Sequence, residues 1–159
     1  MHLGHNEVVL KIYYHHYFPF AISLLKMIGA SLPFYFMLFL LADSLSNNVI
    51  ILIHLGIVTV FTLAVIYITI VYWLDRLVVT NRRVIFIDWK YLTTKAEFEA
   101  KLKDVQDIRT VERGILASLP FLDYGVVEIR TASDRTVINF PQAPNPEGIR
   151  QFIYKIQTK

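Results

Sequence analysis

Few side chains in this sequence combine the residue type and the spacing that enzyme chemistry needs. The 159-residue chain has no cysteine, which excludes thiolate catalysis, disulfides and cysteine zinc sites. All five histidines lie at or before His54, so residues 75–159 cannot contain a Ser/His/Asp triad. No glycine-rich phosphate loop, zinc-ligand spacing or nucleophile elbow occurs, and the adjacent His15 and His16 would point to different sides of a helix or strand. The sequence therefore predicts a protein that is not an enzyme and that holds neither a metal nor a cofactor.

Two adjacent arginines, Arg82 and Arg83, are the strongest candidates for contact with a ligand. They follow Thr80 and Asn81 in an expected turn, where their adjacent charges make contact with an anionic lipid headgroup an alternative. Residues 75–159 contain 14 basic and 11 acidic side chains, and a polybasic lipid-binding cluster would need about four or more adjacent cations. A solvated hairpin turn is therefore favoured over a phosphate site. No basic and aromatic stripe indicates a nucleic-acid partner.

The elements that would position these residues begin with two long apolar segments. Residues 49–74 contain no Asp, Glu, Lys or Arg, and residues 21–42 contain only Lys26. A helix of about 20 apolar residues crosses a bilayer core. The sequence predicts a transmembrane hairpin of helices at about 21–42 and 49–74, joined by a link at 43–48.

The charges around the two spans predict their orientation. The link at 43–48 has no Lys or Arg, whereas 14 follow Leu74. Basic residues that flank a span favour the cytoplasmic side. We expect a multi-pass protein of the bacterial cytoplasmic (inner) membrane with both termini in the cytoplasm. The first 20 residues carry Glu7 and Lys11 without a small-residue cleavage site, so the first span is expected to remain as a signal anchor.

Aromatic and polar residues mark the spans. The aromatic clusters at 13–18 and 72–73 are typical of headgroup belts. Lys26 is expected to extend to the interface, and His54 to hydrogen-bond to the neighbouring helix. An oligomeric pore or transport accessory built around Pro33 and His54 remains an alternative.

Residues 75–159 have the pattern of a small β-rich domain. Their apolar runs are of strand length and alternate with polar residues, most clearly at 95–103. The predicted strands are 76–80, 83–89, 95–103, 107–113, 126–131 and 136–140, with a short extra strand at 115–119 and a turn at Ser133 and Asp134. Asn145 and Pro146 then favour a helix start, and an apolar stripe follows it at Ile149, Phe152, Ile153 and Ile156.

The apolar segment at 115–122 is a second candidate site. Leu116, Leu119, Phe121 and Leu122 form a loop more apolar than a solvated connection, and Pro120 interrupts any central strand. The loop either folds over the domain's own core or contacts headgroups, the hairpin or another subunit.

Several strings, in their order, resemble the bacterial pleckstrin-homology-like membrane proteins, the group that includes the YdbS-like proteins. Residues 77–85 look like the opening hairpin of that family, and 105–108 look like its isoleucine-glutamine-aspartate-valine motif. Residues 114–116 followed by 123–125 look like its glycine-leucine-leucine to tyrosine-glycine segment. The resemblance implies a bent, seven-stranded antiparallel β-sandwich capped by a C-terminal helix. It implies no known reaction.

Together these patterns predict two parts. Residues 1–74 form an N-terminal segment and the transmembrane α-hairpin, and residues 75–159 form a cytoplasmic pleckstrin-homology-like domain. The expected function is a membrane-tethered interaction or scaffolding module. Its expected partners are the lipid bilayer and either a protein partner or a second copy of the chain. The alternatives are sensing of anionic lipid headgroups by the domain and the oligomeric pore or transport accessory.

Overall fold

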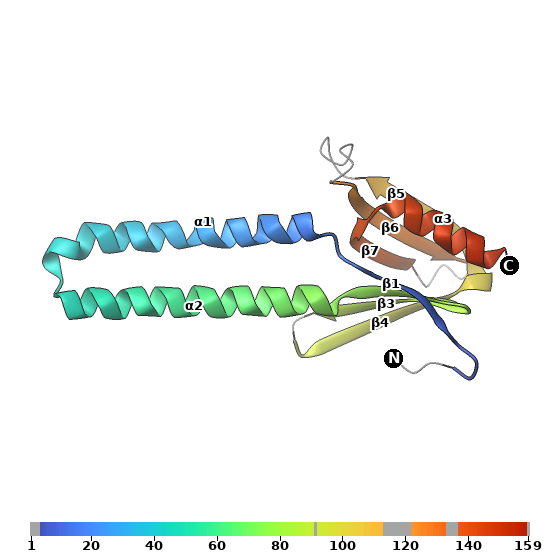
Figure 1. Cartoon of the computed structure of the whole chain (residues 1–159), viewed down its shortest axis with the longest axis horizontal. Helices are drawn as coiled ribbons and strands as arrows, with labels where there is room; N and C mark the ends of the chain where they lie inside the picture. Colours follow the sequence, from blue (N-terminus) through green and yellow to red (C-terminus); the bar gives the residue numbers. More distant parts are fainter. Residues whose placement is uncertain (1–3, 91, 113–121, 133–136, 159) are drawn as a thin grey trace. The chain divides into compact units, whose positions relative to one another are not determined.

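The computed structural model describes residues 4–90, 92–112, 122–132 and 137–158. The chain divides into two compact units (Figure 1). One unit is Tyr17–Ile70, and the other combines Met1–His16 with Val71–Lys159. The second unit is therefore built from two pieces of chain that flank the first.

The first unit is the apolar hairpin. Helices α1 (Tyr17–Leu41) and α2 (Asn47–Leu74) are joined through the short 3-10 helix η1 (Ala42–Ser44). Both helices are long and apolar enough to cross a membrane, and within the described residues neither helix contains a buried residue. The prediction of two such helices is confirmed, and both begin a few residues earlier than predicted.

Ring contacts join the two helices within the hairpin. Phe34 and Phe61 pack edge to face at 5.8 Å between ring centroids, and His54 lies 5.5 Å from Tyr35. The contact of His54 is thus with an aromatic ring, where a hydrogen bond to the neighbouring helix was predicted. Helix α1 continues through Pro33, whose ring removes one backbone donor.

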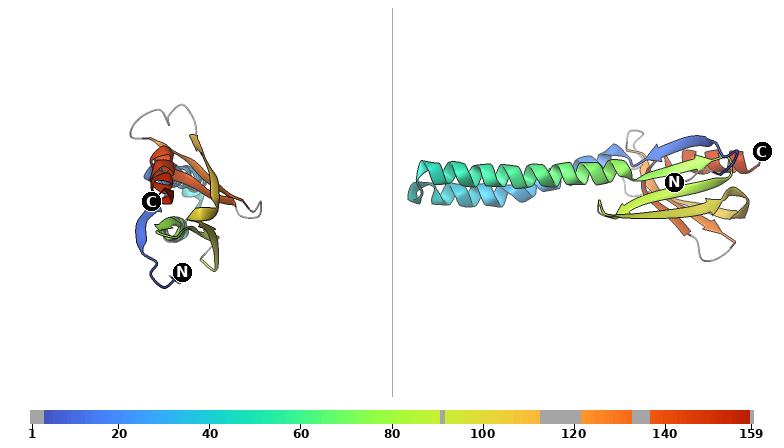
Figure 2. Two further views of the ribbon diagram at one scale, coloured as in Figure 1. Left: turned by 90° about the vertical axis from the view of Figure 1, so that its right-hand side faces the viewer. Right: turned by 90° about the horizontal axis from the view of Figure 1, so that it is seen from below.

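The second unit is an antiparallel sandwich closed by a helix (Figures 1 and 2). A four-stranded sheet in the order β1-β2-β3-β4 faces a three-stranded sheet in the order β5-β6-β7. The strands are β1 (Val9–Tyr14), β2 (Arg76–Thr80), β3 (Arg83–Lys90), β4 (Thr94–Lys101), β5 (Val105–Glu112), β6 (Tyr124–Thr131) and β7 (Val137–Pro144). The 3-10 helix η2 (Leu102–Asp104) connects the sheets, and α3 (Pro146–Gln157) ends the chain. Two antiparallel sheets capped by a C-terminal helix are the pleckstrin-homology-like architecture that the sequence predicted.

The first strand was not predicted, and it changes how the domain is assembled. Residues 9–14 pair antiparallel with β2, with Ile12 opposite Val78 and Tyr14 opposite Arg76. The domain therefore starts in the N-terminal segment and resumes after the hairpin, instead of starting at residue 75. Of the predicted aromatic belt, Tyr13 and Tyr14 belong to this strand.

Because β1 precedes the hairpin, the turn at Arg82 and Arg83 connects the second and third strands of the domain and not the first and second. Residues 77–85 look like the family's opening hairpin in sequence, but they form the second hairpin of the sheet, β2–β3. Local pattern could not show this, because the partner of β2 on its other edge lies before both helices.

The predicted strands in the second half of the chain are confirmed, with shifted ends. Strand β4 stops at Lys101, because Leu102 turns into η2 and becomes buried. Strand β5 starts at Val105, and the pairing register shifts between Val105 and Asp107. The family-like string at 105–108 therefore has a structural role at this irregularity.

The core lies between the sheets and under α3. Residues Ile149 and Ile153 of α3 are fully buried, and Phe152 and Ile156 pack against the same core, as the apolar stripe predicted. Burial of one such side chain contributes about 1.5–3 kcal/mol. The Asn145 side chain accepts a hydrogen bond from the Gly148 amide at 2.7 Å, which confirms the predicted N-cap.

Close packing between strands requires a glycine at position 125 in β6. A Cβ atom at this position would collide with the carbonyl oxygen of Val111 on the neighbouring strand. The glycine of the family-like tyrosine-glycine segment is thus needed for the close approach of β5 and β6.

The candidate apolar loop lies mostly outside the described residues. This is the case for Leu116, Leu119 and Phe121, for the extra strand at 115–119, and for the turn at Ser133 and Asp134. Leu122 is described, and it is buried at 6% exposure.

Candidate ligand-binding cavity

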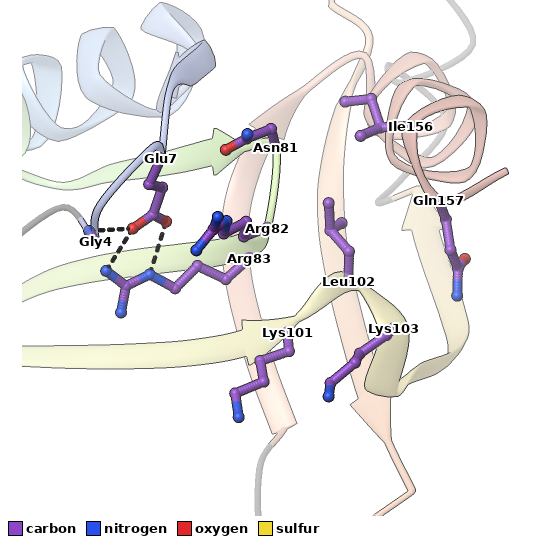
Figure 3. Close-up of a pocket in the computed structure, with 10 residues that line it drawn as sticks. All are labelled: Gly4, Glu7, Asn81, Arg82, Arg83, Lys101, Leu102, Lys103, Ile156 and Gln157. Atoms are coloured by element: carbon purple, nitrogen blue, oxygen red, sulfur yellow. Dashed lines mark hydrogen bonds and ion pairs between the residues drawn. The ribbon is translucent and has the colours of Figure 1, made fainter. Parts of the chain in front are cut away.

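A partly buried ion pair ties the N-terminal segment to the β2–β3 turn. The Arg83 guanidinium donates from Nε to Oε1 of Glu7 at 2.8 Å and from Nη2 to Oε2 at 2.9 Å (Figure 3). The Glu7 carboxylate also accepts from the Thr80 hydroxyl at 2.8 Å and from the Gly4 amide at 2.7 Å. These hydrogen bonds, with that of Arg83 foremost, lower the pKa of Glu7 to about 2 although burial opposes this. Glu7 therefore stays ionised in this pair at neutral pH.

The rest of the turn holds the same segment. The Asn81 side chain accepts from the Val8 amide at 3.0 Å and donates to the Asn6 carbonyl at 3.2 Å. The Thr80 hydroxyl oxygen accepts from the amides of Arg82 and Arg83. Thr80, Asn81 and Arg83, three of the four residues at 80–83, thus stabilise the fold through these hydrogen bonds.

The two candidate arginines, Arg82 and Arg83, have different surroundings. Arg83 is matched by two carboxylates, because its Nη1 also donates to Oε2 of Glu99 at 2.5 Å. Arg82 is exposed, and among the described residues no carboxylate pairs with it. The sequence named these residues together, but only Arg82 keeps an uncompensated charge.

A cavity of about 640 Å³ opens beside this turn. Four cations and one carboxylate line it, together with polar and apolar groups; the lining residues are Gly4, Glu7, Asn81, Arg82, Arg83, Lys101, Leu102, Lys103, Ile156 and Gln157. Figure 3 shows that the basic side chains come from separate elements: the β2–β3 turn, the end of β4 and η2. The described part of the chain contains no carboxylate in an ion pair with Lys101 or Lys103. The cavity thus combines three uncompensated cations with an apolar wall.

The opposite end of the sheet, where β1 and β2 meet the chain of the hairpin, is also polar. The His15 ring lies with Nδ1 2.6 Å from the Pro141 carbonyl oxygen and Nε2 3.5 Å from Oδ2 of Asp75. The other oxygen of Asp75 accepts from the Trp89 amide at 2.7 Å. Burial raises the pKa of Asp88, and the neighbouring Asp75 charge adds to that effect.

Adjacent histidines at this end have separate environments. The His15 ring stacks on Phe140 at 4.9 Å, and the His16 ring stacks on Tyr124 at 5.6 Å. Burial lowers the pKa of His16, against the smaller opposing effect of Asp123. Among the described residues no group of three or more His, Asp or Glu side chains is arranged to hold a metal ion.

Sequence reasoning missed three contributors to the cavity: Glu7, Lys101 and Lys103. Glu7 lies 76 residues from Arg83, so no local pattern connects the two. The two lysines were assigned to the exposed face of a long strand. Their basic character and their position beside a strand end were the available signals.

Comparison with known proteins finds a solved structure of low similarity. No family model matches the chain, and no curated protein matches it. Among solved structures, the chain is similar to a DUF1696 family protein with a pleckstrin-homology domain from Shewanella loihica PV-4. The match has a TM-score of 0.41 and 15% identity, and it covers 52% of this chain and 70% of that one. A likeness of this size does not carry a function from one chain to the other.

Proposed function

We propose that the protein is a membrane-tethered, non-enzymatic interaction module of the bacterial pleckstrin-homology-like, YdbS-like type. The observation that carries this proposal is that the apolar hairpin is inserted between β1 and β2, two strands that pair directly. A domain built in this way is attached to the bilayer through two chain segments. Its function is to hold a binding surface at the membrane.

The short connections support tethering. Only residues 15 and 16 separate β1 from α1, and only Asp75 separates α2 from β2. Connections of this length leave little slack, so a partner in the same membrane meets the domain at high effective concentration. Individually weak contacts then suffice for association.

The topology proposed is cytoplasmic for both termini in the inner membrane. The connection at 43–48 lacks Lys and Arg, whereas residues 75–159 carry 14 of them. This asymmetry is the one that the positive-inside rule associates with a cytoplasmic domain.

The edge strand β1 is the surface proposed for a protein partner or a second copy. Ile12 and Tyr14 lie on one face of this strand and are 41% and 42% exposed, and Leu10, at the shift in pairing register, is 45% exposed. The other edge, β4, presents Lys95, Glu97, Glu99 and Lys101, and charged side chains discourage strand addition. An edge that is apolar on one side of a sheet is suited to pairing with another chain.

Site-specific photocrosslinking in native membranes tests this role. A photoreactive residue replacing Ile12 is expected to give a discrete crosslinked species, whereas the same residue replacing Glu97 on the opposite edge is the matched control. Equal yields from both positions, or a species only at Glu97, would count against β1 as the interaction surface. A tag after Lys159 that proteases reach in intact cells would contradict the topology.

The cationic cavity favours a second candidate function, which is sensing of an anionic lipid headgroup. Arg82, Lys101 and Lys103 supply the positive charge that such a role needs. The three residues lie on different elements, so the recognition would depend on the fold and not on a basic run in the sequence.

A further inference from the structure

The two connections that lead into and out of the hairpin meet through a pair of side chains. His15 lies in the connection from β1 to α1, and Asp75 is the whole connection from α2 to β2. The Nε2 atom of His15 lies 3.5 Å from Oδ2 of Asp75, and the two side chains are only 5% and 16% exposed. Residues 15, 16 and 75 therefore form one junction, in which a single pair joins the two connections.

Both nitrogens of the His15 ring face oxygen atoms. Nδ1 lies 2.6 Å from the Pro141 carbonyl oxygen, which can only accept, so Nδ1 carries a hydrogen. Nε2 faces a carboxylate oxygen of Asp75, which when ionised also only accepts. A neutral ring with its hydrogen on Nδ1 turns a lone pair toward Asp75, whereas the imidazolium donates on both sides. The surroundings are therefore complementary to the protonated ring.

The backbone of β7 meets the junction through a bulge. Pro141 and Gln142 together oppose the single residue Val126 of β6, since the pairing register shifts there. Gln142 has a φ of 53°, a left-handed conformation that costs free energy for a residue with a side chain. Its carbonyl oxygen accepts from the His16 amide at 2.8 Å, beside the contact of Pro141 with the His15 ring. Strained backbone persists where surrounding contacts hold it, and here the junction supplies two of those contacts.

The other rings around His15 come from α2 and β7. The Tyr72 ring lies 5.5 Å from the His15 ring, and its hydroxyl donates to the His16 carbonyl oxygen. The uncharged Phe140 ring stacks on His15 at 4.9 Å. The His16 ring has a separate environment, where the charge that acts on it is that of Asp123. Aromatic walls thus shield the His15–Asp75 contact without adding a charge to it.

A second carboxylate, Asp88 on β3, also interacts with this ring. Burial raises the pKa of Asp88, and the charge of Asp75 adds to the rise, whereas the charges of Lys90 and His15 oppose it. Two acidic side chains, Asp75 and Asp88, therefore lie where a positive charge on His15 stabilises their ionised forms.

We propose that His15 and Asp75 form a proton-binding site that fastens the junction when His15 is protonated and loosens it when the proton leaves. The proton lies on Nε2, facing Oδ2 of Asp75. When it passes to water, Nε2 keeps the electron pair, and the attraction between the ring and the carboxylate is lost. The charge of histidine ordinarily changes between about pH 5 and 8, so the site responds to modest changes in pH. Beyond tethering, the attachment of the domain to its hairpin is then sensitive to pH.

The direction of the response follows from the form of the ring that the fold favours. A site that favours charged histidine stabilises the junction at low pH, and this contribution is lost as the pH rises through the histidine range. The contribution of Glu7 has the opposite sign and changes only below pH 4.5, so the two effects are separable.

Backbone hydrogen exchange of the full chain in nanodiscs measures how tightly the junction is held. The reporter is the His16 amide, which is bonded to the Gln142 carbonyl oxygen. Its protection factor, taken relative to the intrinsic exchange rate at each pH, is expected to fall about tenfold from about pH 5.5 to about pH 8.5. A fall of that size is expected from the loss of one charge-assisted hydrogen bond.

Four variants assign the response to its groups. His15→Gln cannot titrate, and Asp75→Asn keeps an oxygen acceptor for the Trp89 amide but removes the charge. In both, the protection factor is expected to vary by no more than about twofold over the same pH range, because the charge pairing is absent. His16→Gln is the matched control, since it removes the neighbouring ring and leaves the reporting amide in place. The full response is expected to persist in His16→Gln and in Asp88→Asn.

Three results would overturn the proposal. These are a response that persists in His15→Gln, a response that Asp75→Asn leaves unchanged, and a response that is lost in His16→Gln or Asp88→Asn. A measurement on the unmodified chain covers the case in which a variant does not fold. Nitrogen-15 NMR of labelled histidine is expected to show Nε2 of His15 losing its proton over the pH interval in which protection falls. A fall in protection while that signal stays constant would contradict the proposal as well.

Discussion

The two ends of the four-stranded sheet place charged groups in opposite ways. Where the hairpin joins the sheet, Asp75 accepts from the Trp89 amide and faces His15, so its carboxylate is used by the fold. At the β2–β3 turn, Arg83 is compensated by Glu7, whereas Arg82 stands exposed beside it. The paired charges therefore stabilise the fold. The unpaired charges beside the cavity are available to a ligand of opposite charge.

The largest expected effect follows from loss of the Glu7–Arg83 pair. Glu7→Gln leaves the guanidinium without its bidentate acceptor in a site where the Glu7 side chain is only 2% exposed. We expect the free energy of unfolding of the sandwich to fall by about 2 kcal/mol, since an uncompensated charge stays partly buried. Urea titration followed by tryptophan fluorescence, on the full chain in nanodiscs, measures this change.

Glu97→Gln is the control for that measurement. Glu97 pairs with Lys95 on the exposed face of β4, and such exposed pairs contribute only about 0–1 kcal/mol. Equal losses in the two variants would mean that the Glu7–Arg83 pair has no special structural weight.

The second prediction concerns the loss of folding stability at acid pH. The folded-state pKa of Glu7 is about 2 and its ordinary value is 4.5, so the folded protein binds fewer protons than the unfolded chain between these values. The contribution of Glu7 is complete above about pH 4.5 and is lost as the pH falls through 2. Protonation and Glu7→Gln both remove the negative charge that Arg83 pairs with, so the two effects are expected to be similar in size.

Unfolding free energies between pH 6 and pH 2.5 check this prediction. The unmodified chain is expected to lose stability more steeply than the Glu7→Gln variant, which lacks the titrating group. Parallel acid limbs for the two proteins would show that other carboxylates control the loss.

The junction end gives a smaller expected effect. Asp75→Ala removes the acceptor of the Trp89 amide and the anion that faces His15, at an expected cost of about 1–2 kcal/mol. Asp75→Asn keeps an oxygen acceptor and is expected to recover about half of the loss. If the asparagine variant were as unstable as the alanine variant, the charge and not the hydrogen bond would be the important feature of this end.

The smallest expected effect sharpens the contrast between the two ends. The combined change Arg82→Gln, Lys101→Gln and Lys103→Gln is expected to alter the unfolding free energy by no more than about 0.5 kcal/mol without ligand, because surface substitutions of this kind act weakly. Relief of repulsion among three like charges makes a slight gain the favoured direction. A loss near 2 kcal/mol would show that these cations also serve the fold.

Local pattern accounts for most of the elements. Period-two alternation predicted β4, and β-branched runs predicted β2 and β3. The N-cap at Asn145 and the apolar stripe after it predicted α3. Each of these signals acts between residues a few positions apart, which is why the sequence displays it.

Strand β1 and the cavity have no such local signal. Three of the six residues of β1 are exposed apolar side chains, so the strand lacks the usual inward and outward alternation. Its identity comes from pairing with β2, which follows the whole hairpin. The Glu7–Arg83 pair depends in turn on that pairing, because it brings the N-terminal segment beside the β2–β3 turn.

The sequence by itself determined the two long apolar helices, the strands of the second half of the chain and the closing helix, since hydrophobic periodicity and capping act over one or two turns. Tertiary structure alone decided that the sandwich begins before the hairpin, that Arg83 is neutralised and that Arg82 shares a cavity with Lys101 and Lys103. Those outcomes depend on which distant segments meet, and the free energy that brings them together comes from burial of the common core and not from any local motif.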